Sequence, residues 1–375
     1  MDALTTPSNW QKVRLGDIAE INPPTIIPNV FYYIDLESVE KGQLLNKQLM
    51  IKNKAPSRAR RLLSKNDILY QLVRPYQRNN YFFTLNGNYV ASTGYAQIRT
   101  LQNPSFLYFA LHSNYFVNAV LDRCEGTSYP AISSNELKKC EVILPPLNEQ
   151  IAIANILSDV DRYLYSLDAL ILKKESVKKA LSFELLSQRK RLKGFNQAWQ
   201  KVRLGDICEI VKGQQINKIS LNNTDKYPVI NGGIDFLGYT NKFNVSKNTI
   251  AISEGGTCGY VRFMTSDFWS GGHNYSLQKI SNKVNNLCLY HILKSYEKDI
   301  MKLGVGSGLK NIQLKALKDF EILLPPLDEQ IAIANILSAL DHEIISLKNK
   351  KRQFENIKKA LNHDLMSAKI RVLKK

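Results

Sequence analysis

Two arginine-rich segments in the first third of the chain, residues 57–61 and 73–81, combine side chains that can bind nucleic acids. Arginine forms paired hydrogen bonds with phosphate or guanine, and the Asn and Gln side chains of the second segment can read adenine. Both segments therefore predict DNA contacts, although a solvent-exposed basic surface without a partner would have the same sequence. The candidate contact residues are Arg58, Arg60, Arg61, Arg74, Tyr76 and Arg78.

Glycine-rich loops in the second half of the chain could offer backbone amides to a phosphate. They are residues 254–260, 270–275 and 304–311, and residues 125–128 of the first half align with the last of these without a gap. A glycine-rich loop beside a lysine can bring N–H groups against a DNA phosphate, but tight turns explain the same glycines equally well. The candidate contact residues are Thr127, Gly255, Gly256, Thr257, Lys310 and Asn311.

No arrangement of residues in the sequence predicts catalysis. Asn22-Pro23-Pro24-Thr25 is similar to the N-P-P-aromatic motif of amino-methyltransferases. The aromatic residue is missing and no G-x-G turn precedes it, so we interpret it as a turn. Residues 304–311 lack the full spacing of a phosphate-binding loop, and the five cysteines and five histidines form no cluster at metal-ligand spacing. We therefore expect a binding protein with no catalytic residue and no metal site.

The composition favours a polyanionic partner. The 375 residues include 51 Lys and Arg and 33 Asp and Glu, giving a net charge of +18. Nucleic acid is the first partner that this excess suggests, and an anionic membrane surface is the second. No run reaches the roughly 18 apolar residues of a membrane span, and the N-terminus has no signal-peptide pattern. Scattered cysteines without a C-x-x-C pair predict free thiols in a cytoplasmic protein.

The chain is an internal duplication. Residues 10–21 recur at 199–210 with one difference, and residues 144–158 recur at 324–338 with one difference. Between these blocks, residues 22–125 and 211–305 have almost no sequence in common. Near-identical segments suggest one task performed twice, and divergent segments suggest that two different objects are recognised. A drifted tandem repeat with no functional meaning is the alternative.

Positive charge is divided equally between the two copies. Residues 10–145 contain 16 basic and 10 acidic side chains, and residues 199–325 contain the same numbers. The excess is therefore not confined to a tail, and each copy carries charge with which it could hold a nucleic acid.

A long helix is predicted after each Pro-Pro pair, because an N-cap residue and an acidic first turn follow the prolines. Apolar or bulky residues then recur at three-four spacing over about 45 residues without Pro or Gly, as in a heptad seam. Lys174, Glu343 and Lys350 interrupt the seam. Its residues are Ile153, Ile156, Val160, Tyr163, Leu167, Leu170, Val177, Leu181, Ile333, Ile336, Leu340, Leu347, Phe354, Ile357 and Leu361. The helices would pair with each other, or each would pack on its own domain.

The expected fold class is α+β, with two pseudo-symmetric mixed α/β domains separated by two long antiparallel, coiled-coil helices. Strands are predicted at 66–73 and 248–253, and short amphipathic helices at 106–121 and 287–303. The predicted boundaries are 1–145 for the first domain, 146–192 for the first long helix, 193–198 for a linker, 199–325 for the second domain and 326–375 for the second helix.

These features together resemble the specificity (S) subunit of a Type I restriction-modification system. The resemblance depends on Trp10…Leu15-Gly16-Asp17-Ile18 and Trp199…Leu204-Gly205-Asp206-Ile207, which open the two domains. It also depends on the two L-P-P-L-x-E-Q blocks at 144–150 and 324–330, which close them. Residues 67–76 resemble first-domain sequences of the same family, and the match covers essentially the whole chain.

The resemblance implies two target recognition domains, each reading one half of a split site in double-stranded DNA, with the helices setting the gap. It implies docking of methyltransferase (M) subunits, two of them expected, and association with restriction (R) subunits. S-adenosylmethionine, ATP and Mg would be bound by those partners, so this chain would hold no cofactor. The residues assigned to docking or to the spacer are Pro145, Pro146, Glu149, Gln150, Pro325, Pro326, Glu329 and Gln330.

Three alternatives stay open at this point. The chain could serve a Type IIB-like system, in which cleavage and methylation are fused in one partner, and only neighbouring genes would distinguish that case. It could be a coiled-coil scaffold that never touches DNA, which would show no salt-dependent DNA affinity. It could also be a methyltransferase with a degenerate motif, which would bind S-adenosylmethionine.

Overall fold

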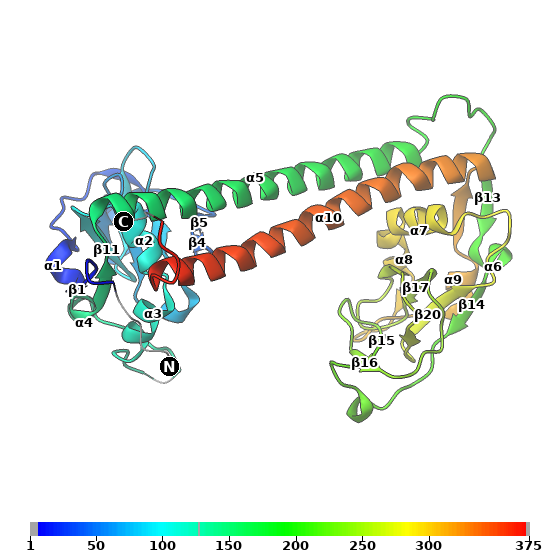
Figure 1. The fold of residues 1–375 in the computed structure, drawn as a ribbon. Coiled ribbons are helices and arrows are strands. Elements are labelled where there is room, and N and C mark those ends of the chain that lie inside the picture. The colour runs from blue at the N-terminus through cyan, green and yellow to red at the C-terminus, as the bar shows by residue number, and fades with distance from the viewer. Residues whose placement is uncertain (1–6, 127, 373–375) are drawn as a thin grey trace. The chain divides into compact units, whose positions relative to one another are not determined.

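The computed structural model describes residues 7–126 and 128–372. The chain divides into two compact units, which we call unit 1 and unit 2. Unit 1 consists of the residues up to 168 together with those from 350 onward, and unit 2 consists of residues 169–349. Each unit contains one divergent domain and a stretch of each of two long helices, α5 and α10 (Figure 1).

Unit 1 contains two four-stranded sheets with strand orders β6-β3-β10-β7 and β2-β11-β8-β9. Every residue of β8 and of β10 is buried, because both faces of these strands are covered. The strands are β2 (Ala19–Ile21), β3 (Val30–Ile34), β6 (Gln48–Ile51), β7 (Ala59–Leu62), β8 (Ile68–Gln71), β9 (Tyr81–Phe82), β10 (Tyr89–Ser92) and β11 (Tyr95–Thr100), with a short hairpin of β4 (Val39–Glu40) and β5 (Gln43–Leu44).

Short helices cover the second sheet of unit 1. The single helix predicted at 106–121 is divided in two, because the Ser113 side chain accepts a hydrogen bond from the N–H of Phe116 and caps a new helix. The helices are α1 (Leu15–Ile18), α2 (Pro104–Ala110), α3 (Asn114–Leu121) and α4 (Ser134–Lys139), with 3₁₀ turns η1 (Lys52–Lys54) and η2 (Pro75–Gln77).

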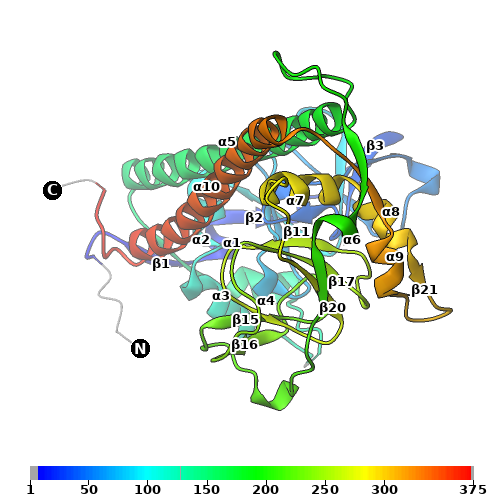
Figure 2. The same ribbon diagram turned by 90° about the vertical axis from the view of Figure 1, so that its right-hand side faces the viewer.

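Unit 2 contains an antiparallel sheet, β14-β20-β17-β18, and a three-stranded sheet, β16-β15-β19. The helix predicted at 287–303 is again divided in two, and its first part, α7, packs on β17 and β18 (Figure 2). The strands are β14 (Glu209–Lys212), β15 (Tyr227–Ile230), β16 (Gly238–Thr240), β17 (Thr249–Ser253), β18 (Val261–Met264), β19 (Trp269–Ser270), β20 (Asn274–Gln278), β21 (Gly304–Val305) and β22 (Asn311–Ile312). The helices are α6 (Leu204–Ile207), α7 (Asn286–Ser295), α8 (Glu297–Lys302), α9 (Leu314–Lys318) and the 3₁₀ turn η3 (Lys218–Ser220).

The repeated sequence blocks fold into the same two-stranded frame in both units. In unit 1, β1 (Gln11–Arg14) pairs antiparallel with β12 (Glu141–Leu144). In unit 2, β13 (Gln200–Arg203) pairs with β23 (Glu321–Leu324) in the equivalent register. Each frame therefore pairs the first strand of a domain with its last strand, and the divergent sequence lies between these two strands in the chain.

The two long helices are α5 (Leu147–Leu186) and α10 (Leu327–Met366), each of 40 residues. Their ends pack on the domain cores. In unit 1, Ile153 and Leu157 of α5 and Leu365 of α10 belong to the main apolar core. In unit 2, Ile333 and Leu337 of α10 belong to the corresponding core. The helix ends thus bury apolar residues against their domains, as one of the two sequence alternatives proposed.

Between their ends the helices contact each other through ion pairs and through the Tyr163 and Phe354 rings, whose centroids are 4.6 Å apart. In unit 1, Asp161 pairs with Lys358 at 2.5 Å, and Asp168 pairs with Lys351 at 2.5 Å. In unit 2 the pairs are Lys174–Glu343 at 2.8 Å, Glu175–Lys348 at 2.6 Å and Lys178–Asp341. Going along α5 from Asp161 to Asp168, the paired residue on α10 moves back from Lys358 to Lys351. In unit 2, going from Lys174 to Lys178, it moves back from Glu343 to Asp341. The two helices therefore run antiparallel.

The predicted apolar seam is wrong at three positions. Leu170, Val177 and Ile357 are 38%, 44% and 49% exposed. Ile171 and Ile344 are buried in this stretch, at 7% and 6% exposed, and the Lys174–Glu343 and Lys178–Asp341 ion pairs lie beside them. Two of the predicted interruptions, Lys174 and Glu343, are bonded to each other.

Candidate nucleic-acid interface

The first arginine segment lies on β7 and the turn before it. Arg58 and Arg60 are exposed, and the Arg60 Nε donates to the carbonyl oxygen of Ser57 at 2.8 Å. Arg61 is partly buried, and its Nε has no hydrogen-bond partner among the described residues. Burial, reinforced by neighbouring Arg60, lowers the pKa of the Arg61 guanidinium. Arg58 and Arg60 can therefore meet a phosphate directly, whereas Arg61 would have to turn outward.

The second segment presents a tyrosine between two arginines. Tyr76 lies in η2 and is 48% exposed, and both flanking arginines adopt left-handed backbone conformations, with φ of 54° and 55°. The Arg74 guanidinium lies 4.3 Å from the centroid of the Tyr129 ring, and the Arg74 N–H donates to the Pro130 carbonyl. The structure thus brings this segment together with the loop around 125–131. Thr127, also predicted to contact DNA, lies outside the described residues.

Arg78 is bonded to other residues of its own domain. Its guanidinium donates to the carbonyl oxygen of His112 at 2.9 Å and to Asn114 Oδ1 at 2.8 Å. These bonds hold the side chain against the connection between α2 and α3. Arg78 is thus bonded to its own domain but is partly exposed, and its DNA contact stays a prediction.

In unit 2, five loops converge into one group, which we call the loop cluster: residues 212–215, 231–233, 254–257, 270–273 and 310–311. Backbone hydrogen bonds join them, from Glu254 N to the His273 carbonyl, from Thr257 N to the Gly232 carbonyl and from Gln214 N to the Ser270 carbonyl. The predicted contact residues of this half of the chain are thereby brought together, although Gly255 and Lys310 are far apart in sequence.

Glycine is required where these loops touch. A Cβ on Gly255 would lie 2.3 Å from Asn311 Oδ1, and a Cβ on Gly232, whose φ is +79°, would lie 2.6 Å from the Gly255 carbonyl oxygen. Gly255 is buried, which corrects its assignment as a DNA contact: its lack of a side chain makes room for Asn311. Gly256 is exposed and Thr257 is partly exposed, so they stay candidates.

A buried carboxylate anchors the loop cluster. Glu254 is 8% exposed and accepts hydrogen bonds from Lys212 Nζ at 2.7 Å and from Tyr275 Oη at 3.2 Å. Burial, followed by the charge of Glu254, raises the pKa of Tyr275 to about 12, so the phenol stays a donor at neutral pH. His273 Nδ1 lies 3.9 Å from the second oxygen of Glu254. The Glu254 carboxylate therefore holds together the buried part of the loop cluster, from which the exposed side chains project.

The exposed side chains of the loop cluster are of the types that read base edges and phosphates. Amides pair with adenine, and lysine binds phosphate or guanine. The sequence prediction omitted Gln214 and Gln215, although they follow a glycine at the end of a strand, which is the available signal. The exposed polar residues are Lys212, Gln214, Gln215, His273, Lys310 and Asn311.

The Glu and Gln residues assigned to partner docking or to the spacer have roles inside the chain. Glu149 is 2% exposed, accepts from Trp10 Nε1 at 3.0 Å, and receives two hydrogen bonds from Arg371 at 2.7 and 3.0 Å. In unit 2, Glu329 makes the same contacts with Trp199 and Arg191. A partner cannot reach these buried carboxylates, so their docking assignment is corrected.

The glutamines beside them are buried for a related reason. Gln150 donates to the Pro145 carbonyl at 2.8 Å and accepts from the backbone N–H of Asn103, the residue that caps α2. Gln330 does the same with Pro325 and Asn285 in unit 2. Docking through these side chains is likewise corrected. The L-P-P-L-x-E-Q block therefore joins the start of a long helix to its domain, and Pro146 and Pro326 are its partly exposed members.

The motif at Asn22 is a turn, as interpreted from the sequence. Asn22 has a φ of 57°, and its side chain donates to Ser134 Oγ and accepts from the N–H of Gln97. In the part of the chain that the structure describes, no group of three or more His, Cys, Asp or Glu could hold a metal ion. No helix of that part is long and apolar enough to cross a membrane.

Comparison with known proteins places the duplicated frame in a family. Residues 7–174 and 196–356 match the family described as Type I restriction modification DNA specificity domain. A putative type I specificity subunit of Mycoplasma pneumoniae is 38% identical over 165 residues, which are 42% of this chain and 44% of the relative. A type I restriction enzyme specificity subunit of Methanocaldococcus jannaschii, MjaVIII, is 25% identical over 417 residues, 99% of this chain and 95% of the relative.

The chain spans less than half the length of the first two curated relatives it matches, 44% and 40%. Among solved structures, the S subunit of a Type I restriction-modification system from M. genitalium has a TM-score of 0.70 at 20% identity, with 97% of each chain covered. This likeness confirms the fold class expected from the sequence. Because the family match extends over most of both halves, the chain belongs to the family of Type I restriction-modification DNA specificity domains.

Proposed function

We propose that this chain is the DNA-recognition subunit of a Type I restriction-modification complex. Each divergent domain reads one half of a bipartite site in double-stranded DNA, and the two long helices set the gap. The observation that carries the proposal is the combination of one duplicated frame with two unrelated insertions. The same Trp–Glu–Arg contacts hold both domains, whereas the surfaces that could face DNA differ between the units.

The DNA contacts we assign are Arg58, Arg60 and Tyr76 with Arg74 in unit 1, and the exposed side chains of the loop cluster in unit 2. The exposed side-chain amides of the loop cluster favour contacts with base edges, and the exposed Lys310 favours contact with a phosphate. Salt dependence is expected to follow, with log affinity falling by about 0.9 per phosphate contact for each unit of log salt. Affinity that does not change with salt would favour the scaffold alternative.

The partners are methyltransferase and restriction subunits. A duplicated frame supports two methyltransferase subunits, because each unit presents the same block at the start of its long helix. Since the four buried Glu and Gln side chains are unavailable, docking uses the exposed faces of α5 and α10 and the frame prolines Pro146 and Pro326. The S-adenosylmethionine, ATP and Mg that the system's reactions use are bound by these partners, so this chain holds no cofactor for those reactions. Its cysteines are free thiols in the cytoplasm.

Domain replacement tests the proposal. The chain is produced together with its methyltransferase, and the modified sequences are mapped by sequencing that detects methylated bases. Replacing residues 22–125 with the equivalent stretch of a relative is expected to change one half of the recognised site and to leave the other half and the gap unchanged. A change in both halves, or none in either, would contradict two independent recognition domains.

Single substitutions test the loop cluster. Asn311→Ala is expected to relax the second half of the site, since a good base contact contributes about 1–3 kcal/mol of discrimination. Lys315→Ala, an exposed lysine on α9 outside the cluster, is the matched control and should leave the site unchanged. Equal loss of modification at all sites in both variants would assign a non-specific role to Asn311.

A further inference from the structure

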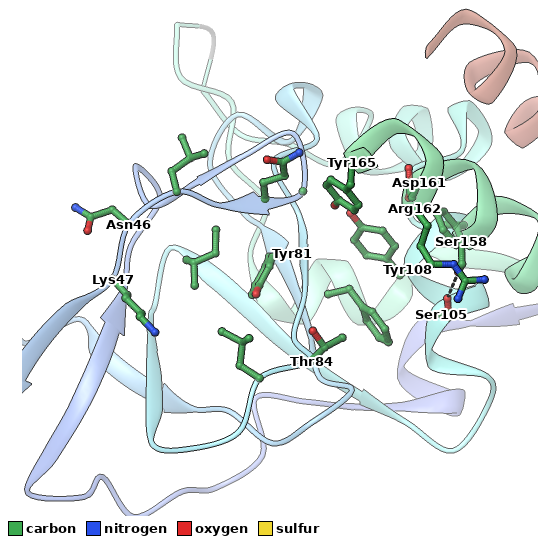
Figure 3. A pocket seen from close by; sticks show the side chains of 17 residues that line it. Asn46, Lys47, Tyr81, Thr84, Ser105, Tyr108, Ser158, Asp161, Arg162 and Tyr165 are labelled. Carbon is green, nitrogen blue, oxygen red and sulfur yellow. Dashed lines mark hydrogen bonds between the residues drawn. The ribbon is translucent and has the colours of Figure 1, made fainter. Parts of the chain in front are cut away.

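Unit 1 contains a large cavity that the DNA-recognition proposal does not use. Two hollows, of about 720 Å³ and 610 Å³, lie between the β4–β5 hairpin, α2 and residues 158–168 of α5, and the second extends to α10. They share Gln43, Tyr108, Phe109, Asp161 and Tyr165 as lining residues. Figure 3 shows the larger of the two. Each is within the range of roughly 300–1,000 Å³ that small-molecule sites occupy.

Aromatic rings form one wall of the cavity. Tyr108 and Tyr165 lie next to each other, with Asp161 close by (Figure 3). Tyr165 is 46% exposed although it is a large aromatic residue. Burial, followed by the charges of Asp161 and Asp168, raises the pKa of its phenol, which therefore keeps its proton at neutral pH. The Tyr108 ring packs against Phe82, Phe109 and His112, so the exposed ring and hydroxyl of Tyr165 are the main surface that the wall offers to a ligand.

The other wall of the smaller hollow carries excess positive charge. Lys and Arg contribute five lining residues, and Asp and Glu contribute three. All three carboxylates are already paired: Asp161 with Lys358, and Asp168 and Glu355 with Lys351. The remaining cations are Lys41, Arg78 and Lys359.

Two of these remaining cations, Arg78 and Lys359, form none of the ion pairs found among the described residues. The two partners of Arg78 are a carbonyl oxygen and an amide oxygen. Lys41 forms an ion pair with Glu40 at 4.0 Å, in which both side chains are exposed to solvent and the attraction is therefore weak. Lys359 is exposed and has no carboxylate partner among the described residues. Burial, with further contributions from Lys358 and Arg78, lowers the pKa of nearby His112 to about 4, so this histidine is neutral and adds no charge.

We propose that this cavity binds a nucleotide, with the base against Tyr108 and Tyr165 and the phosphate towards Lys359 and Lys41. A plain anion would not need the aromatic wall, and an apolar ligand would not need the excess of positive charge. Stacking of a base on an aromatic side chain contributes about 1–3 kcal/mol, and cations bind phosphate through charge-assisted hydrogen bonds. The nucleotide is either free or part of a nucleic-acid strand, and the experiment distinguishes these sources.

The internal duplication supplies matched controls. The position equivalent to Tyr165 is Ile345, the position equivalent to Phe109 is His291, and the position equivalent to Lys359 is Lys179. Unit 2 therefore keeps the lysine but lacks two of the three aromatic residues. A ligand that needs both features is expected to bind in unit 1 alone.

Isothermal titration of the full chain tests the proposal, with ATP, adenosine and tripolyphosphate as probes. ATP is expected to bind with a Kd below about 1 mM, and more tightly than either of its parts. Tyr165→Ala should weaken ATP binding about tenfold through lost stacking, and Lys359→Glu by a similar factor through the reversed charge. The controls Ile345→Ala and Lys179→Glu should bind ATP like the parent, and unchanged circular dichroism confirms that all variants are folded.

Competition with a short thymidine oligonucleotide identifies the source of the nucleotide. If ATP does not bind but Tyr165→Ala and Lys359→Glu weaken oligonucleotide binding, while their controls do not, the cavity holds a nucleotide of a strand. The proposal is overturned if tripolyphosphate binds as tightly as ATP and Tyr165→Ala has no effect, since the site would then be a simple anion site. It is equally overturned if neither ATP nor the oligonucleotide responds to the two variants.

Discussion

Glu149 and Glu329 occupy equivalent positions of the duplicated sequence and make equivalent contacts in the two units. Each is a buried carboxylate held by a tryptophan from the start of its domain and by an arginine that follows the opposite long helix. A buried carboxylate is tolerated only when it is paired and hydrogen-bonded. The three residues therefore depend on one another, and they connect three separate parts of the chain in each unit.

Removing Arg371 should destabilise unit 1. Arg371→Ala leaves the Glu149 carboxylate buried with only the indole N–H as a partner, and we expect a loss of about 2–3 kcal/mol in the free energy of unfolding. This is below the cost for a fully buried pair, because Arg371 is 31% exposed. Urea denaturation followed by tryptophan fluorescence measures the effect.

The double variant separates charge from packing at this site. Glu149→Gln in the Arg371→Ala background should recover part of the loss, because a neutral amide costs less to bury than a carboxylate. Arg191→Ala is the matched variant in unit 2 and should act through Glu329 alone. If Glu149→Gln recovers nothing, lost packing of the arginine would explain the effect instead.

His291 makes the stability of unit 2 depend on pH. Burial lowers its pKa from 6.5 to about 4, so the native state holds it neutral while the unfolded state takes up a proton first. The free energy of unfolding therefore falls as the pH drops from about 6.5 towards 4 and is flat, for this group, above that range. At pH 5 the loss should be about 2 kcal/mol relative to neutral pH.

Replacing the histidine tests this account. His291→Gln should remove that part of the pH dependence, as measured by urea denaturation between pH 4.5 and 7.5 (roughly the titration window). His112 of unit 1 shifts in the same direction, so some acid sensitivity should persist. An unchanged pH profile in His291→Gln would show that the neutral state of this histidine is not what stabilises unit 2 at neutral pH.

At the scale of elements, α5 and α10 combine two kinds of contact. Their ends bury apolar residues on the domain cores, and between those ends they face each other through lysine–carboxylate pairs. Partly exposed ion pairs contribute roughly 0–1 kcal/mol each. Most of the stability of these helices therefore comes from buried apolar residues, at their ends and at Leu167, Ile171 and Ile344 between them, and the ion pairs specify alignment.

Two leucines three residues apart on α5 should respond very differently to truncation. Leu167 is 4% exposed and Leu170 is 38% exposed. Leu167→Ala should lower the free energy of unfolding by about 2–4 kcal/mol, whereas Leu170→Ala should change it by less than about 1 kcal/mol. Thermal or urea unfolding measures both. Equal losses in the free energy of unfolding would mean that Leu170 is packed as well as Leu167, as the heptad pattern predicts.

At the scale of the whole molecule, the boundary between the units divides both helices at matched points, after Asp168 in α5 and before Lys350 in α10. The ion pairs described above lie within one unit or the other. A length change at this boundary in both helices would therefore leave the contacts of each unit intact, whereas a change in one helix would shift it against its partner.

Inserting four residues at both points should alter the DNA gap. Each helix becomes about 6 Å longer, which is close to two base-pair steps of roughly 3.4 Å. We expect a lengthened gap with both half-sequences unchanged, as read from the methylated sites. The single insertion in α5 is the control and should impair modification. A double insertion that retains activity with the original gap would mean that the partner subunits, and not the helices, set the spacing.

Sequence alone determined the duplication, the two long helices and the frame around each domain, since these depend on local patterns: repeated blocks, prolines before an N-cap, and three-four spacing. The family resemblance followed from the same blocks. The strands at β8 and β17 and the turn at Asn22 were also predictable, because turn residues next to apolar runs specify them locally.

Only the tertiary structure decided what the individual side chains do. Trp10 and Arg371 meet Glu149 across 139 and 222 residues of sequence, and no local pattern specifies such a contact. For the same reason Arg78 is bonded to its own domain and Gly255 lies beneath Asn311. Burial and charge pairing depend on which distant segments pack together. The sequence motifs therefore show which residue types are present, and the tertiary structure determines which partners those residues have.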